Sequence, residues 1–199
     1  NAGIPTKLLD ISPELVGQGL ARIKDHYRRN VERGRLARSE LKGHLGLISG
    51  ISSYDNLYDV DIVVEAVFED LNLKQEVFRC LNTACRPDAI LATNTSTLNI
   101  DKIAGVTTQP DHVIGTHFFS PANVMHLLEI VRGRETSLDT VVSALKLAKT
   151  IGKIGVVVGV CDGFVGNRML HSFLREAFFL LEEGAIPEQI DRVMVEFGF

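Results

Sequence analysis

Short apolar runs alternate with helical segments along most of the chain, and this alternation limits the possible folds more than any other feature. A strand that is followed by a helix and then by another strand returns to the same edge of a sheet, so the repeat predicts a parallel, doubly wound sheet. We expect strands at residues 7–10, 46–53, 61–67, 89–93, 112–119, 127–131 and 154–158, and helices at residues 12–34, 71–85 and 137–151.

The alternation stops near residue 160. Residues 164–183 and 187–197 both have helical spacing, and no strand is expected among them. We therefore predict an α/β domain over residues 1–160 and the start of an all-helical domain over residues 161–199. The chain begins without methionine and runs almost directly into a strand, so we expect a fragment of a longer protein.

Charge and cysteine content exclude several classes of partner. The net charge of −4 provides no basic surface for nucleic acid, and no apolar run reaches the length of a membrane span. Three cysteines, an odd number, are most simply explained as reduced thiols in an intracellular compartment. Their spacing from the histidines does not indicate a metal site. Small molecules and other protein chains are the expected partners.

Asp10 follows the first expected strand. An acidic residue in this position of a dinucleotide-binding domain accepts hydrogen bonds from the ribose hydroxyls of NAD. The glycine-rich phosphate loop of such a domain lies about 20 residues upstream, which is before residue 1. Without that loop, the alternative interpretation of Asp10 is a carboxylate at a helix entry.

A polar tetrad, Asn94–Thr97, follows the strand expected at residues 89–93. Ligands of a doubly wound sheet bind beyond the carboxyl ends of its strands, so these side chains are placed to reach one. The alternative is a turn that caps the next helix.

His117 lies at the end of another strand, and Glu129 lies twelve residues later in an apolar strand. Histidine titrates near neutral pH and suits the removal of a hydroxyl proton. A carboxylate in an apolar strand is costly unless it is paired, and pairing with His117 would relieve that cost and stabilise imidazolium. The alternative is a structural histidine and an unrelated glutamate.

The segment around Asn167 contains Gly159, Gly163 and Gly166 between a strand and a helix. The spacing of the glycines does not match a nucleotide-binding loop, so Gly163 and Gly166 are interpreted as close-packing positions at the domain junction. The Asn167 amide could donate to a carbonyl oxygen across an interdomain cleft, or it could simply cap the helix.

Four segments occur along the chain in the order Asn94–Leu98, Gly115–Pro121, Met125–Glu129 and Gly163–Arg168. Together they are far more specific than any one of them. On these segments the sequence resembles the 3-hydroxyacyl-CoA dehydrogenase family, and it is most similar to the dehydrogenase part of multifunctional β-oxidation enzymes. The resemblance covers essentially the whole chain and implies a Rossmann-like NAD-binding domain that lacks its first strand and phosphate loop here.

The resemblance assigns a role to several residues. It makes His117 the catalytic base and Glu129 its partner, and it places Ser96 and Asn167 on the substrate oxygen. It makes Asp10 the ribose ligand of NAD. The remaining cofactor positions implied by the resemblance are Glu69 and Lys74 near the nicotinamide half, Ser96, and Ser120, where many members have asparagine.

The activity implied is oxidation of an L-3-hydroxyacyl-CoA to a 3-ketoacyl-CoA with NAD. The implied setting is a homodimer or a multifunctional chain, in a bacterial cytoplasm or a peroxisome, with an acyl-CoA as substrate. The isolated chain could be inactive, since the phosphate loop is missing. The alternatives are a related NAD-dependent hydroxy-acid dehydrogenase and a non-enzymatic structural protein with the same fold.

Overall fold

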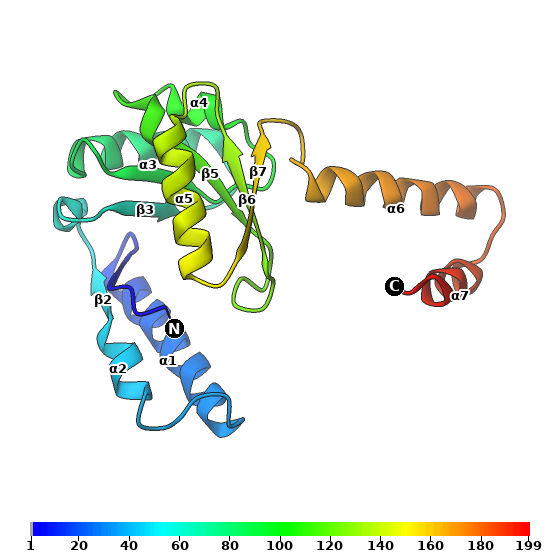
Figure 1. The fold of residues 1–199 in the computed structure, drawn as a ribbon, viewed down its shortest axis with the longest axis horizontal. Helices are drawn as coiled ribbons and strands as arrows, with labels where there is room; N and C mark the ends of the chain where they lie inside the picture. Colours follow the sequence, from blue (N-terminus) through cyan, green and yellow to red (C-terminus); the bar gives the residue numbers. More distant parts are fainter. Residues whose placement is uncertain (1) are drawn as a thin grey trace.

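The computed structural model describes residues 2–199, which form an α/β body followed by two helices that extend away from it (Figure 1). No helix in these residues is both long enough and apolar enough to cross a membrane. The strands are β1 (Thr6–Leu9), β2 (Ile48–Ile51), β3 (Ile62–Glu65), β4 (Ile90–Thr93), β5 (Val113–Phe118), β6 (Leu127–Arg132) and β7 (Ile154–Gly159). The α-helices are α1 (Pro13–Glu32), α2 (Leu41–Gly46), α3 (Leu71–Ala84), α4 (Ile100–Ala104), α5 (Leu138–Thr150), α6 (Gly166–Glu182) and α7 (Pro187–Phe197), and the 3-10 helices are η1 (Tyr54–Leu57) and η2 (Pro110–His112).

The main sheet has five strands in the order β3-β4-β5-β6-β7, and all its neighbours are parallel except β5 and β6. Strands β1 and β2 form a separate parallel pair. The predicted mostly parallel sheet is confirmed. The short loop between β5 and β6 explains the one antiparallel pair, since a parallel connection needs a longer crossover.

Alternate residues of the central strands face opposite layers of helices. Ala92 and Ile114 pack with the buried face of α5, whereas Leu91 and Val113 pack with α3 and α4. Figure 1 shows α5 across one face of the sheet and α3 and α4 on the other. Because both faces are covered, these strands consist of nearly continuous apolar residues, as a doubly wound sheet requires.

Strand β3 is less buried than the central strands. It is an edge strand of the five-stranded sheet, with Val64 41% exposed, and Val67 in the loop after it is 38% exposed. An apolar run identifies a strand but does not specify how many neighbours the strand has. Although β3 is partly exposed, the carboxylate side chain of its last residue, Glu65, is buried.

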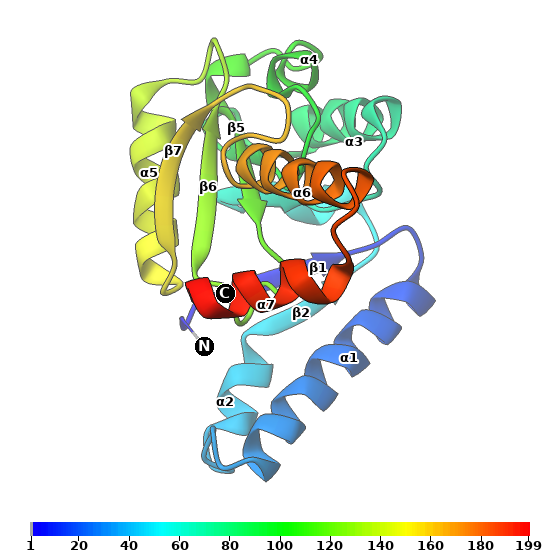
Figure 2. The same cartoon turned by 90° about the vertical axis from the view of Figure 1, so that its right-hand side faces the viewer.

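The β1–β2 pair packs with α1 and α2 to one side of the main sheet (Figure 2). The predicted start of α1 is confirmed, because the Ser12 hydroxyl accepts from Leu15 N at 3.3 Å and Pro13 takes the first helical position. The sequence did not predict α2, which is six residues long and contains two glycines.

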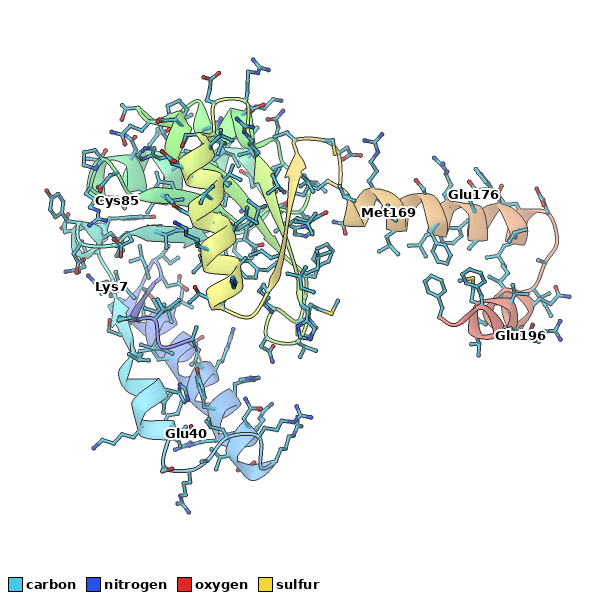
Figure 3. All side chains as sticks on the ribbon, viewed as in Figure 1. Lys7, Glu40, Cys85, Met169, Glu176 and Glu196 are labelled. Atoms are coloured by element: carbon cyan, nitrogen blue, oxygen red, sulfur yellow. The ribbon has the colours of Figure 1, made fainter. Side chains whose placement is uncertain are left out.

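The predicted change to helices alone is confirmed after β7. Gly163 and Phe164 have φ angles of +66° and +48°, which delay the start of α6 to Gly166, two residues later than expected. In Figure 3, Met169 lies where α6 leaves the body and Glu176 lies farther out. Helix α7 turns back beneath α6 in Figure 1. The division between residues 160 and 161 stays a prediction.

The packing around Gly115 generates a stability prediction. A Cβ on Gly115 would lie 2.7 Å from Val131 Cβ and 3.0 Å from Ile100 Cδ1. We expect Gly115→Ala to lower the free energy of unfolding by about 1–3 kcal/mol, since a packed core cannot move aside. Gly17→Ala is the control, because its Cβ would meet no atom within 4 Å on α1. Equal stability of the two variants in denaturant titrations would contradict the prediction.

Candidate active site

Polar side chains gather where three neighbouring parallel strands end. Glu65 and Thr93 are the last residues of β3 and β4, and His117 is the last but one of β5. Ligands of open α/β sheets bind beyond these carboxyl ends, because the loops there diverge and leave space. This edge of the sheet is therefore the candidate site.

The first cluster joins His117 to Glu129. The two residues are direct partners in the antiparallel ladder between β5 and β6, which places both side chains on the same face. His117 Nδ1 lies 2.7 Å from Glu129 Oε2, and the side chains are 8% and 1% exposed. Since a carboxylate only accepts, Nδ1 carries the proton and donates it. In the neutral ring the lone pair is then on Nε2.

The second carboxylate oxygen of Glu129 binds the start of α6. Oε1 accepts from Val165 N at 3.0 Å and from Gly166 N at 2.8 Å. The first amides of a helix have no partner within the helix and carry partial positive charge, so a carboxylate is stabilised there. One side chain thus orients the imidazole and caps the helix of the following segment.

Aromatic rings enclose the imidazole. The His117 ring centroid lies 4.4 Å from that of Phe119 and 5.7 Å from that of Phe164. A Cβ on Gly166 would lie 2.6 Å from Phe119 Cζ, and one on Gly163 would lie 3.1 Å from the amide nitrogen of Arg168. Both glycines are close-packing positions, as predicted.

The second cluster centres on Glu69, just before α3. Its Oε1 accepts from Ser96 N at 2.8 Å, from Ser96 Oγ at 3.1 Å and from Thr95 Oγ1 at 2.6 Å. Partial burial acts to raise the pKa of the Glu69 carboxyl, but these hydrogen bonds and the charge of Lys74 outweigh it and hold the pKa below its usual value. Glu69 is therefore an ionised acceptor for this loop at neutral pH.

Lys74 lies beneath this cluster. Its side chain is fully buried, with Nζ 2.8 Å from Glu65 Oε1 and 3.7 Å from Glu69 Oε2. In this arrangement the ammonium group contacts carboxylates of the chain itself. Its predicted contact with a cofactor remains a prediction.

Asn94 connects the two clusters. Its Oδ1 accepts from Phe118 N at 3.0 Å, which joins the loop after β4 to the end of β5 beside His117. Within the tetrad, Thr95 Oγ1 accepts from Leu98 N at 2.9 Å, and Asn99 then caps α4. The tetrad is thus a turn that leads into a helix, and its Ser96 also takes part in the polar cluster.

The other predicted residues lie around these clusters. Asp10 is exposed just after β1, where its Oδ1 accepts from Ile11 N at 2.7 Å. Ser120 is exposed after β5. Asn167 is the second residue of α6 and half-buried, so it is not the cap of that helix, a function that Glu129 performs.

Glu65 and the amides at the start of α6 were not predicted from the sequence. Glu65 carries the same signal that identified Glu129, a carboxylate in an otherwise apolar strand. The helix amides carry no signal in their side chains. Among residues 2–199, no three His, Cys, Asp or Glu side chains lie together as a metal site would require.

Two family models match consecutive parts of the chain. Residues 1–161 match the 3-hydroxyacyl-CoA dehydrogenase NAD binding domain, and residues 163–199 match the 3-hydroxyacyl-CoA dehydrogenase C-terminal domain.

Individual relatives agree with these matches. The peroxisomal bifunctional enzyme of Homo sapiens is 55% identical over 74% of this chain and 20% of its own length. The probable 3-hydroxybutyryl-CoA dehydrogenase of Bacillus subtilis is 40% identical over 98% of this chain and 68% of its own length. The crystal structure of (S)-3-hydroxybutyryl-CoA dehydrogenase from Ralstonia eutropha has a TM-score of 0.92 at 37% identity, over 95% of this chain and 67% of that one. The chain spans about one fifth of the length of the bifunctional relatives.

The double role of Glu129 generates a prediction. Glu129→Gln keeps the shape, but one of its two oxygens becomes an amide donor that faces either His117 Nδ1–H or the α6 amides. We expect the free energy of unfolding to fall by about 1–3 kcal/mol, because a buried donor loses its acceptor. Calorimetry of the full-length protein measures this change, with the exposed Glu135→Gln as control. Indistinguishable melting curves for the two variants would argue against the double role.

Proposed function

Since the chain belongs to the 3-hydroxyacyl-CoA dehydrogenase family, we propose that it oxidises an L-3-hydroxyacyl-CoA to a 3-ketoacyl-CoA with NAD in fatty-acid β-oxidation. The observation that carries the proposal is the buried pair of His117 and Glu129 at the carboxyl end of β5. A base with its proton held on Nδ1 and its lone pair on Nε2 is what removal of an alcohol proton requires.

His117 acts as the base. Its Nε2 takes the proton of the C3 hydroxyl while the hydrogen on C3 leaves with its electron pair, so the alcohol becomes a ketone and the imidazole becomes imidazolium. Glu129 stabilises that charge without becoming protonated, as the carboxylate of a catalytic triad does. When bound, NAD supplies the acceptor for the hydride.

Ser96 and Asn167 position the reacting oxygen. The Ser96 hydroxyl donates to Glu69 at 3.1 Å, and with substrate bound it is proposed to turn its proton to the reacting oxygen, whose own proton goes to His117. The Asn167 amide, at the start of α6, is proposed to donate to the same oxygen as it becomes a carbonyl. Glu129 holds the start of α6, so it also holds Asn167 in place relative to His117.

The residues of the chain fit NAD. Asp10 presents an exposed carboxylate at the carboxyl end of β1, which suits the hydroxyls of a ribose and repels a 2′-phosphate. Glu69, Lys74 and Ser96, with Ser120, are proposed to lie on the nicotinamide side.

We further propose that residues 1–160 and 161–199 belong to different domains. The full protein would work either as a homodimer or as part of a multifunctional chain. Relatives named as peroxisomal enzymes and a bacterial relative support a peroxisome or a bacterial cytoplasm as its location.

The central test is activity. In the full-length protein we expect reduction of acetoacetyl-CoA with NADH, and we expect His117→Gln to lower kcat by about 10²–10⁴-fold, the usual contribution of a general base. NADH binding should change little, because the imidazole is proposed to act on the substrate. His44→Gln, on α2 beside Tyr27, is the control. Normal turnover by His117→Gln would remove His117 from the mechanism.

A second test concerns the cofactor. Asp10→Ala should weaken NAD binding about 10–100-fold, because hydrogen bonds to a charged group contribute about 1.5–3 kcal/mol. Discrimination against NADP should fall as well, since the repelling charge is gone. Fluorescence titration of both cofactors measures the effect, with Asp25→Ala on α1 as control. Unchanged affinity for both cofactors would mean that Asp10 only starts the helix.

A further inference from the structure

The buried ion pair between Glu65 and Lys74 takes no step in the reaction above, although Lys74 is proposed to lie on the nicotinamide side. Their side chains are 1% and 0% exposed, and Lys74 Nζ lies 2.8 Å from Glu65 Oε1. Lysine is almost never fully buried unless it is paired. A buried ion pair is also weak support for a stability role, because apolar side chains of similar size often stabilise a fold as well or better.

The hydrogen bonds of the pair extend to each segment around it. Glu65 Oε1 accepts from Val67 N at 2.6 Å, and Glu65 Oε2 accepts from Thr93 Oγ1 at 2.7 Å. Lys74 Nζ donates to the carbonyl oxygen of Asn94 at 3.5 Å. The pair thus joins the loop after β3, the end of β4 and helix α3. These are the segments from which the Glu69 and Ser96 loops emerge.

The Lys74 ammonium group lies near two carboxylates, at unequal distances. Glu65 holds it at 2.8 Å, and Glu69 is 3.7 Å away on the exposed side. The other oxygen of Glu69 accepts from the backbone and the hydroxyl of Ser96. If Glu65 lost its charge, the ammonium group would have one carboxylate left, and it would draw Glu69 away from Ser96.

We propose that Glu65 is a positioning residue, which through Lys74 and Glu69 holds the Ser96 hydroxyl in its place in the site. Glu65 and Lys74 touch no substrate in this role. They limit the positions open to Glu69, and Glu69 in turn limits those open to residues 95–97. The consequence for turnover rests on the proposed function, whereas the consequence for the loop does not.

The experiment separates position from stability. We compare Glu65→Gln, Lys74→Met and the double variant in the full-length protein without ligand. Each single change leaves a buried charge without its partner at 2.8 Å and should lower the denaturation midpoint. The double variant leaves none and should regain much of the midpoint. Hydrogen–deuterium exchange is read for residues 94–98 relative to strand β5, so that a uniform loss of stability cancels.

We expect residues 94–98 to lose about tenfold in relative protection in all three variants, including the stable double variant, because Glu69 no longer has a positioned cation. The Glu69→Gln variant is the reference, because it shows how much relative protection residues 94–98 lose when the loop loses its charged acceptor. The control Asp61→Asn, which breaks an exposed pair with Arg86, should change nothing. If relative protection stays at the wild-type value in the variants, or returns with stability in the double variant, the pair is only structural and the inference is wrong.

Activity provides the second readout. The double variant should reduce acetoacetyl-CoA with lower kcat/KM despite its restored stability, because Ser96 is displaced. If wild-type protein has no such activity, the proposed function fails. The exchange comparison then still decides whether Glu65 positions the loop.

Discussion

The site depends on a single carboxylate that serves two parts of the chain at once. Glu129 binds the imidazole of His117 with one oxygen and the first amides of α6 with the other. A buried carboxylate needs hydrogen-bond donors at its oxygens, or its burial would be too costly. The donors to Oε1 are the first amides of α6, so the start of the helical segment lies against the sheet. Glu129 therefore fixes both the orientation of the His117 imidazole and the placement of α6.

A second polar network supports the opposite side of the site. Glu65, Lys74 and Glu69 are connected beneath the Ser96 loop, and Asn94 joins that loop to β5 beside His117. Both networks lie where strands end, because interior positions of the sheet are covered by helices on both faces and have no space for a ligand. The polar groups that are buried here have partners, which makes their positions specific rather than merely tolerated.

The antiparallel turn between β5 and β6 makes the pairing of His117 with Glu129 possible. Parallel strands joined by a crossover would have placed Glu129 at the far end of its strand from His117. The short connection reverses the chain, and the register then sets the two residues directly opposite each other.

The sequence by itself determined the succession of strands and helices, the helical segment after β7 and the residues of the His117–Glu129 pair. Periodicity, caps and a carboxylate among apolar residues are local signals that need no knowledge of neighbours. Only the tertiary structure decided that the strands form two sheets, that β3 is an edge, that Lys74 is buried between two carboxylates and that Glu129 caps α6. Each of these depends on contacts between residues far apart in the chain, and backbone amides such as those of Val165 and Gly166 have no side chain to indicate their part in advance.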